Sequence, residues 1–170
     1  MPHNANKLEW CLKKAEKELK EGKKHRGLVR VKPNKSLAED HIKKAEHNLN
    51  AISSFKKIGY SDWSASAAFY AAYHCFLAII AKFGYESRNQ ECTFVLIYNL
   101  IESGKIDLEE ETVKKVYDLS SEESQESSSI IDIRENEQYG ISLSIEDDVL
   151  NKIIMTVKSI LDKTKEIIEE

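Results

Sequence analysis

One apolar run constrains the fold of this chain more than any other feature. From Trp63 to Phe83 nearly every residue is apolar, and seven are alanine. A helix that is apolar on all sides belongs at the centre of a protein, and alanine lets neighbouring helices approach it closely. Its most apolar part, Ala65 to Ala81, contains Ser66 and His74 and is shorter than the roughly 20 residues of a membrane span. We therefore expect a buried core helix and no membrane segment.

Apolar residues also recur at helical spacing on both sides of this run. Before it, Leu8–Leu19 predicts a short amphipathic helix, and the stretch from Ser36 to Gly59 predicts a long one. After it, three more helices are predicted, at Cys92–Ile101, Glu109–Leu119 and Ile145–Ile168. Ser36 is a candidate N-cap of the long helix, and Ser144 with Asp147 is a candidate capping box of the last one.

These patterns predict an all-α protein. Only two prolines and six glycines interrupt the chain, and no stretch shows a strand pattern stronger than the helical one. The expected architecture is an antiparallel up-and-down helical bundle of about four main helices with an N-terminal helical extension. Residues 1–35 form that extension, which ends in a basic connector, and residues 36–170 form the bundle. Ser120–Ser129, rich in serine and glutamate, is compatible with a loop and with a solvated helix.

Charge is distributed unevenly along the chain. Residues 1–58 hold 15 Lys and Arg against 7 Asp and Glu, whereas residues 59–170 hold 10 against 22. This asymmetry permits an anionic partner at the N-terminal part and opposes wrapping RNA around the acidic part. The simpler interpretation is a pair of solvated helix faces of opposite sign, which is how charge runs usually occur.

The cysteines and the N-terminal residues favour an intracellular protein. Cys11, Cys75 and Cys92 are scattered, odd in number and form no CxxC pair. We therefore expect buried thiols in a reducing compartment, with neither a disulfide nor a zinc-thiolate site. Residues 1–19 alternate charged and apolar side chains, unlike a secretion signal. The expected location is the cytoplasm.

Common catalytic and cofactor motifs do not occur in the sequence. It has no glycine-rich phosphate loop, HExxH, GxSxG or EF-hand loop. His41 and His47 are six positions apart, which puts them on different faces of a helix. Neither a cofactor nor a metal ion is predicted.

His74 is a different case because it lies inside the most apolar helix. A buried imidazole needs hydrogen-bond partners, so one interpretation is a core histidine whose ring is satisfied by its neighbours. The alternative is a histidine that faces a cleft and titrates there.

Two separated blocks resemble the HEPN domain family. The first is Ser66–His74, followed by Gly84-Tyr85, and the second is Ile133–Tyr139. The similarity extends over roughly residues 36–168. This resemblance implies an up-and-down helical bundle that pairs as a homodimer.

The resemblance also implies where a site would lie. Active members of that family cut RNA without metal, through an arginine, four to six intervening residues and a histidine at the dimer cleft. Arg134 matches the arginine, but Tyr139 stands where the histidine would. Tyrosine, with a pKa near 10, is a much poorer base at neutral pH than histidine, with a pKa near 6.5. Arg134 could still bind a phosphate bidentately.

Three functions remain open. Members with this arginine–tyrosine version are often encoded beside small nucleotidyltransferases, and in some toxin–antitoxin systems the partner modifies a HEPN tyrosine. The leading hypothesis is a homodimeric partner subunit of a minimal nucleotidyltransferase, which binds nucleotide or RNA phosphate through Arg134 and offers Tyr139 as an acceptor. The first alternative is a metal-independent endoribonuclease toxin in which His74 replaces the missing base. The second is a structural adaptor in which Arg134 is salt-bridged and Tyr139 packs at an interface.

Overall fold

The predicted all-α architecture is confirmed. The computed structural model describes residues 2–117 and 129–170. Within these ranges it contains seven helices and two short strands. In chain order they are α1 (Pro2–Lys20), β1 (Leu28–Arg30), α2 (Lys35–Lys57), α3 (Asp62–Lys82), β2 (Tyr85–Ser87), α4 (Gln90–Glu102), α5 (Glu110–Lys114), α6 (Ile130–Tyr139) and α7 (Asp147–Glu169).

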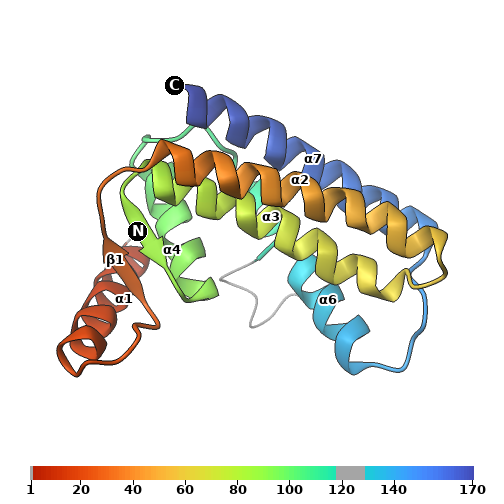
Figure 1. Cartoon of the computed structure of the whole chain (residues 1–170), viewed down its shortest axis with the longest axis horizontal. Coiled ribbons are helices and arrows are strands. Elements are labelled where there is room, and N and C mark those ends of the chain that lie inside the picture. The colour runs from red at the N-terminus through yellow and green to blue at the C-terminus, as the bar shows by residue number, and fades with distance from the viewer. Residues whose placement is uncertain (1, 118–128) are drawn as a thin grey trace.

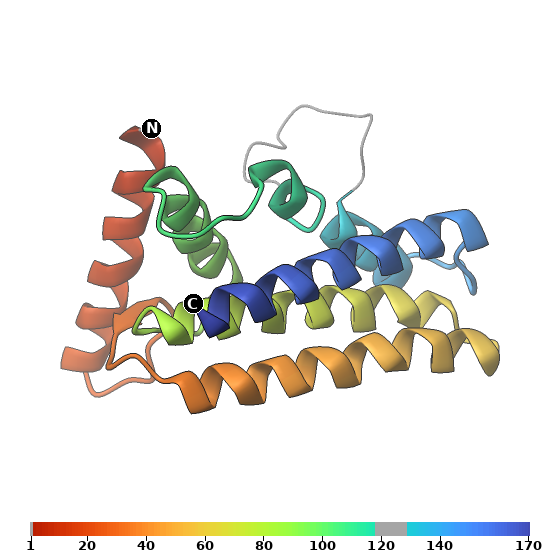
Figure 2. The same ribbon diagram turned by 90° about the horizontal axis from the view of Figure 1, so that it is seen from above.

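Three long helices form the body of the molecule. Figures 1 and 2 show α2, α3 and α7 running side by side, with α3 in contact with both neighbours. Helix α6 packs against α3, and α4 crosses near its C-terminal end, where α1 packs against α4. The central position of α3 follows from its composition, because no face of it is polar enough to face water.

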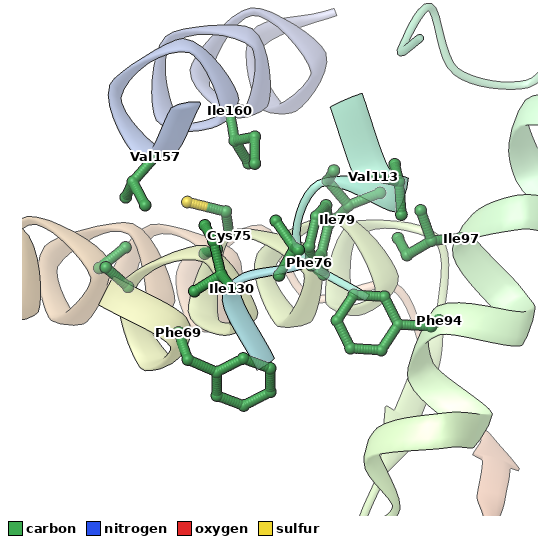
Figure 3. Packing of buried hydrophobic residues seen from close by; sticks show 14 of the residues in the cluster. Phe69, Cys75, Phe76, Ile79, Phe94, Ile97, Val113, Ile130, Val157 and Ile160 are labelled. Carbon is green, nitrogen blue, oxygen red and sulfur yellow. The ribbon is translucent and has the colours of Figure 1, made fainter. Parts of the chain in front are cut away.

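The core gathers around α3. Figure 3 shows Phe69, Phe76 and Ile79 of this helix meeting side chains from α4, α5, α6 and α7. The rings of Phe76 and Phe94 meet edge to face with centroids 5.2 Å apart, a favourable aromatic geometry. Helix α3 is long and apolar enough to cross a membrane by length and composition, but 67% of its most apolar window is buried inside the protein. This burial is typical of the core helix of a soluble protein.

Strands β1 and β2 were not expected from the sequence. They pair antiparallel, with Val29 opposite Glu86. Three residues are too few to show a strand's alternation, so the sequence pattern carries no signal for them. The pairing explains why the basic connector is ordered. Gly27 belongs to this arrangement because a Cβ atom there would lie 2.5 Å from the carbonyl oxygen of Cys11.

The expectation of three free thiols is wrong. Cys11 of α1 and Cys92 of α4 form a disulfide, with Cα atoms 5.8 Å apart, and Cys75 alone remains a buried thiol among the described cysteines. Both paired residues lie on buried faces where α1 packs against α4. Their separation of 81 residues leaves no local trace in the sequence. The cysteines therefore no longer support a reducing compartment.

Two predicted caps are also wrong. Helix α2 is capped by Asn34, whose Oδ1 accepts from the Leu37 amide at 2.9 Å, so Ser36 lies inside the helix. Helix α7 begins after Glu146 without a side-chain cap, and Ser144 and Asp147 form no capping box. The residues between α6 and α7 make a tertiary contact instead, because the Ile145 amide donates to the Ser61 hydroxyl.

The region around residues 109–129 differs from the prediction in part. Helix α5 covers only Glu110–Lys114, whereas a longer helix to Leu119 was expected. Leu119 and residues 120–128 of the serine-rich stretch lie outside the described residues. Its last residue, Ser129, caps α6.

Candidate functional site

Helix α6 carries the two candidate residues of the second sequence block. It starts with a capping box in which Ser129 and Asp132 satisfy each other's backbone amides. Ile130 at its first position is buried in the core cluster, and Ile133 packs against the same cluster. These contacts fix α6 against α3 and direct Arg134 toward that helix.

The Arg134 side chain lies on an aromatic surface of α3. Its guanidinium carbon is 4.5 Å from the ring centroid of Phe69 and 5.9 Å from that of Tyr70. Stacking of this kind suits the flat, weakly hydrated guanidinium group. The side chain is only 12% exposed, so it is held in place and largely removed from water.

Arg134 is incompletely paired. Its ion pair is with Glu135, and the Nη2–Oε1 distance is 3.6 Å, which is too long for a good hydrogen bond. Its Nε atom is buried and has no hydrogen-bond partner among the described residues. A nearly buried cation with so weak a partner is costly unless another group completes it.

Glu137, three residues further along α6, is also incompletely paired, and its charge is opposite to that of Arg134. Its Oε2 atom is buried without a hydrogen-bond partner among the described residues. Burial, with a smaller contribution from the negative charge of Asp62, raises the pKa of Glu137. The same segment of α6 thus holds a donor and an acceptor that the described chain leaves unsatisfied.

Tyr139 lies apart from Arg134. It is the last residue of α6 and is 80% exposed. Five positions along a helix correspond to a rotation of about 140°, so the two side chains leave α6 in different directions. Within one chain, the arginine–tyrosine pair does not form a joint site.

His74 contacts another histidine rather than Arg134. Its Nδ1 atom lies 2.9 Å from Nδ1 of His41 on α2. At this distance one ring donates an N–H and the other accepts, so at least one must be neutral at that nitrogen. Burial, then the nearby His41 and Lys44, lowers the pKa of His74 to about 4. Burial also lowers the pKa of His41.

The histidine pair offers two nitrogen ligands. Protein sites for zinc use three or four ligands, and no group of three or more His, Cys, Asp or Glu with metal-binding geometry occurs within the described residues. The pair is therefore a hydrogen-bonded contact between α2 and α3, and both rings are half-buried.

Sequence reasoning missed several members of these clusters. Phe69 and Tyr70 could be read only as core residues, because nothing local indicates that an arginine some 65 positions later stacks on them. His41 was considered only with His47 of its own helix, although its partner comes from α3. Contacts between helices were the missing information in each case.

Comparison with known proteins places most of the chain in one family. No curated protein matches this sequence. The family model described as HEPN domain matches residues 38–168, which runs from most of α2 through nearly all of α7 and leaves out α1 and β1. The matched part holds Arg134, Tyr139 and the His41–His74 pair. The chain belongs to the HEPN domain family.

Proposed function

We propose that this protein is a homodimeric partner subunit of a small nucleotidyltransferase, in a system of the toxin–antitoxin type in the cytoplasm. In this proposal a nucleotide or RNA phosphate binds at a cleft between two copies, through Arg134. Membership of the HEPN family supports the proposal, since the family is often associated with ribonucleases or nucleotidyltransferases. The proposal requires no metal ion or cofactor held by this chain.

The state of Arg134 is the observation that carries the proposal. A guanidinium that is fixed on Phe69 and weakly paired keeps its donors oriented for a bidentate acceptor. A phosphate or a carboxylate of a second chain would satisfy it. Pairing the buried guanidinium in this way offsets part of the free-energy cost of removing its charge from water.

Exposed apolar side chains near α6 support a partner at this end of the molecule. We call Tyr60, Trp63, Ile141 and Leu143 the end patch; these side chains are 55%, 57%, 98% and 80% exposed. The Ile145–Ser61 hydrogen bond brings the two segments that carry the end patch together, as Figure 1 also shows. Large apolar side chains exposed on adjoining segments are typical of interaction surfaces.

Tyr139 has the exposure that an acceptor of a nucleotidyl group needs. In that reaction its hydroxyl oxygen attacks the α-phosphorus of a nucleoside triphosphate held by the partner enzyme. A P–O bond forms, the bond to pyrophosphate breaks, and the phenolic proton passes to a base of the partner. The phenol here is a substrate, so its weakness as a general base does not matter.

The ribonuclease alternative has less support. His74 is hydrogen-bonded to His41, and its pKa near 4 makes it a weak base. Tyr139 diverges from Arg134 on the helix. A second copy would have to supply the missing base.

Incubation with a small nucleotidyltransferase and a labelled nucleoside triphosphate tests the acceptor role, and a gene for such an enzyme beside this one would identify which to use. We expect label on the wild type and on Tyr85→Phe, which changes a tyrosine of β2 away from α6 and the end patch, and none on Tyr139→Phe. Equal labelling of the Tyr139→Phe variant would remove Tyr139 from the proposal. Failure of the two proteins to co-purify would leave the structural adaptor as the better interpretation.

The ribonuclease alternative has its own test. The purified protein is incubated with mixed RNA in the presence of a chelator, beside Arg134→Ala. We expect both samples to leave the RNA intact. Cleavage by the wild type that is lost in Arg134→Ala would contradict the partner-only proposal, provided circular dichroism shows that the variant is folded.

A further inference from the structure

A second candidate site lies in the other half of the molecule. A hollow of about 390 Å³ forms where the residues after α1 meet β2, and its lining includes Lys23, Lys24, His25, Glu86 and Arg88. Figure 1 shows α1 and β1 at one end of the long helices, away from α6. Lys23, Lys24 and His25 also fall outside residues 38–168, the part matched by the family model. The hollow is therefore separate from the Arg134 site.

Among the described residues that line the hollow, Glu86 is the one carboxylate, and it is already hydrogen-bonded. Glu86 Oε1 lies 3.1 Å from Nε2 of His25 and 3.0 Å from Nε of Arg88. The hydrogen bond to His25, with that of Arg88, holds the pKa of Glu86 below its ordinary value. Glu86 thus stays ionised and orients two of the groups around it, while the remaining lining charges are all positive.

Two of the cations keep free donors. Arg88 uses Nε for Glu86, which leaves both terminal nitrogens of its guanidinium without a partner within the described residues. Lys24 has no ion pair or hydrogen bond to its side chain in residues 2–117 and 129–170. Lys23, in contrast, is paired with Glu21 at 2.8 Å. Arg88 and Lys24 are therefore the groups available to an incoming anion.

His25 lines the hollow and is held in place by Glu86. The residue is only 5% exposed, and its Nδ1 atom is buried without a partner among the described residues. Because an ionised carboxylate can only accept, His25 donates to Glu86 through Nε2. Its other nitrogen is then an unsatisfied buried polar atom, which is rare in a native protein and needs a physical reason.

We infer that this hollow binds a phosphate group, with Arg88 and Lys24 as its donors and His25 and Glu86 as positioning residues. A guanidinium fork and an ammonium group that share one hollow suit the several oxygens and high charge of a phosphate. The backbone leaves room for it, since no atom of the described residues lies within 4 Å of a Cβ position at Gly22. The phosphate comes either from an RNA strand or from the end of a mononucleotide, and the basic N-terminal half favours both.

RNA binding across a salt series tests the site. The full-length protein and the variant Lys24→Gln/Arg88→Gln are titrated against a short labelled single-stranded RNA, with fluorescence anisotropy as the readout. The plot of log K against log salt has a negative slope, and losing two contacts to a single strand should make it shallower by about 1.4. Binding at low salt should weaken about tenfold. Lys152→Gln/Lys158→Gln makes the same charge change on exposed positions of α7 and should leave both values nearly unchanged.

The source of the phosphate is resolved by NMR on the labelled protein. Shifts of the Gly22, Lys24 and Arg88 amides with a nucleoside monophosphate identify a terminal phosphate, and shifts with RNA alone identify the strand backbone. The inference is overturned if neither probe shifts these signals, or if the α7 control loses as much affinity as the double variant. Arg134→Ala separates the two sites: RNA affinity that depends on Arg134 and not on the hollow would overturn this inference while the proposed function stands.

Discussion

At the scale of single residues, the His41–His74 contact determines how the fold responds to acid. Neutral rings can share one hydrogen bond, but two protonated rings 2.9 Å apart would repel each other. The pKa of His74 is about 4 in the folded protein, against about 6.5 in the unfolded chain. The unfolded chain therefore binds more protons between these values, so acid favours unfolding.

We predict that stability falls as the pH is lowered from about 6.5 toward 4. Because His74 is only half-buried, the expected loss is on the order of 1 kcal/mol after allowance for solvent screening. Urea denaturation at pH 7 and pH 4.5 measures it, with His74→Gln beside the wild type to subtract other groups. The variant should lose about 1 kcal/mol less than the wild type over this range, and His47→Gln should behave as the wild type. Identical losses in wild type and His74→Gln would refute this explanation.

At the scale of elements, long helices could be predicted from the sequence and short elements could not. The core helix was predicted at Trp63–Phe83 and observed at Asp62–Lys82, because a long apolar run has a strong period. Helix α6 and strands β1 and β2 are short, and long-range contacts hold them in place. The same limit applies to the candidate site. Family resemblance was enough to pick out Arg134 and Tyr139, but that their side chains point in different directions follows only once both are known to lie on helix α6.

The disulfide makes α1 part of the same folding unit as α4. A cross-link between residues 81 positions apart restricts the unfolded chain and contributes about 2–4 kcal/mol to stability. We predict that a reducing agent lowers the free energy of unfolding by this amount. The Cys11→Ala/Cys92→Ala variant should start lower and show no further effect of the reductant, since Cys75 forms no bond.

The same bond bears on the proposed location. Thiol trapping in intact cells would show whether Cys11 and Cys92 are oxidised where the protein works. Oxidised cysteines are unusual in the cytosol of most organisms, so full oxidation would argue against the cytoplasmic part of the proposal.

At the scale of the whole molecule, the end patch and the basic hollow lie in different halves. This separation allows a protein partner at one end and a phosphate at the other without competition. Lys23 and Lys24 of the basic segment, residues 1–58, meet Arg88 of the later segment in this hollow.

We predict that the protein is a dimer in solution through the end patch. Light scattering should give about twice the chain mass of 19.5 kDa, and Trp63→Glu/Leu143→Glu should shift it toward the monomer. Leu37→Glu, at the distant start of α2 and 43% exposed, is the matched control and should stay dimeric. A monomeric wild type would exclude the homodimer.

The Cys11–Cys92 bond also closes the chain into a ring that contains α2 and α3. A protease that cuts the exposed residues Lys23 or Lys24 would open this ring without releasing α1. The cleaved protein would run as one species on a non-reducing gel and as two pieces after reduction. Proteolysis in that segment would therefore not detach the N-terminal helix, and only reduction followed by unfolding would separate it from the rest of the molecule.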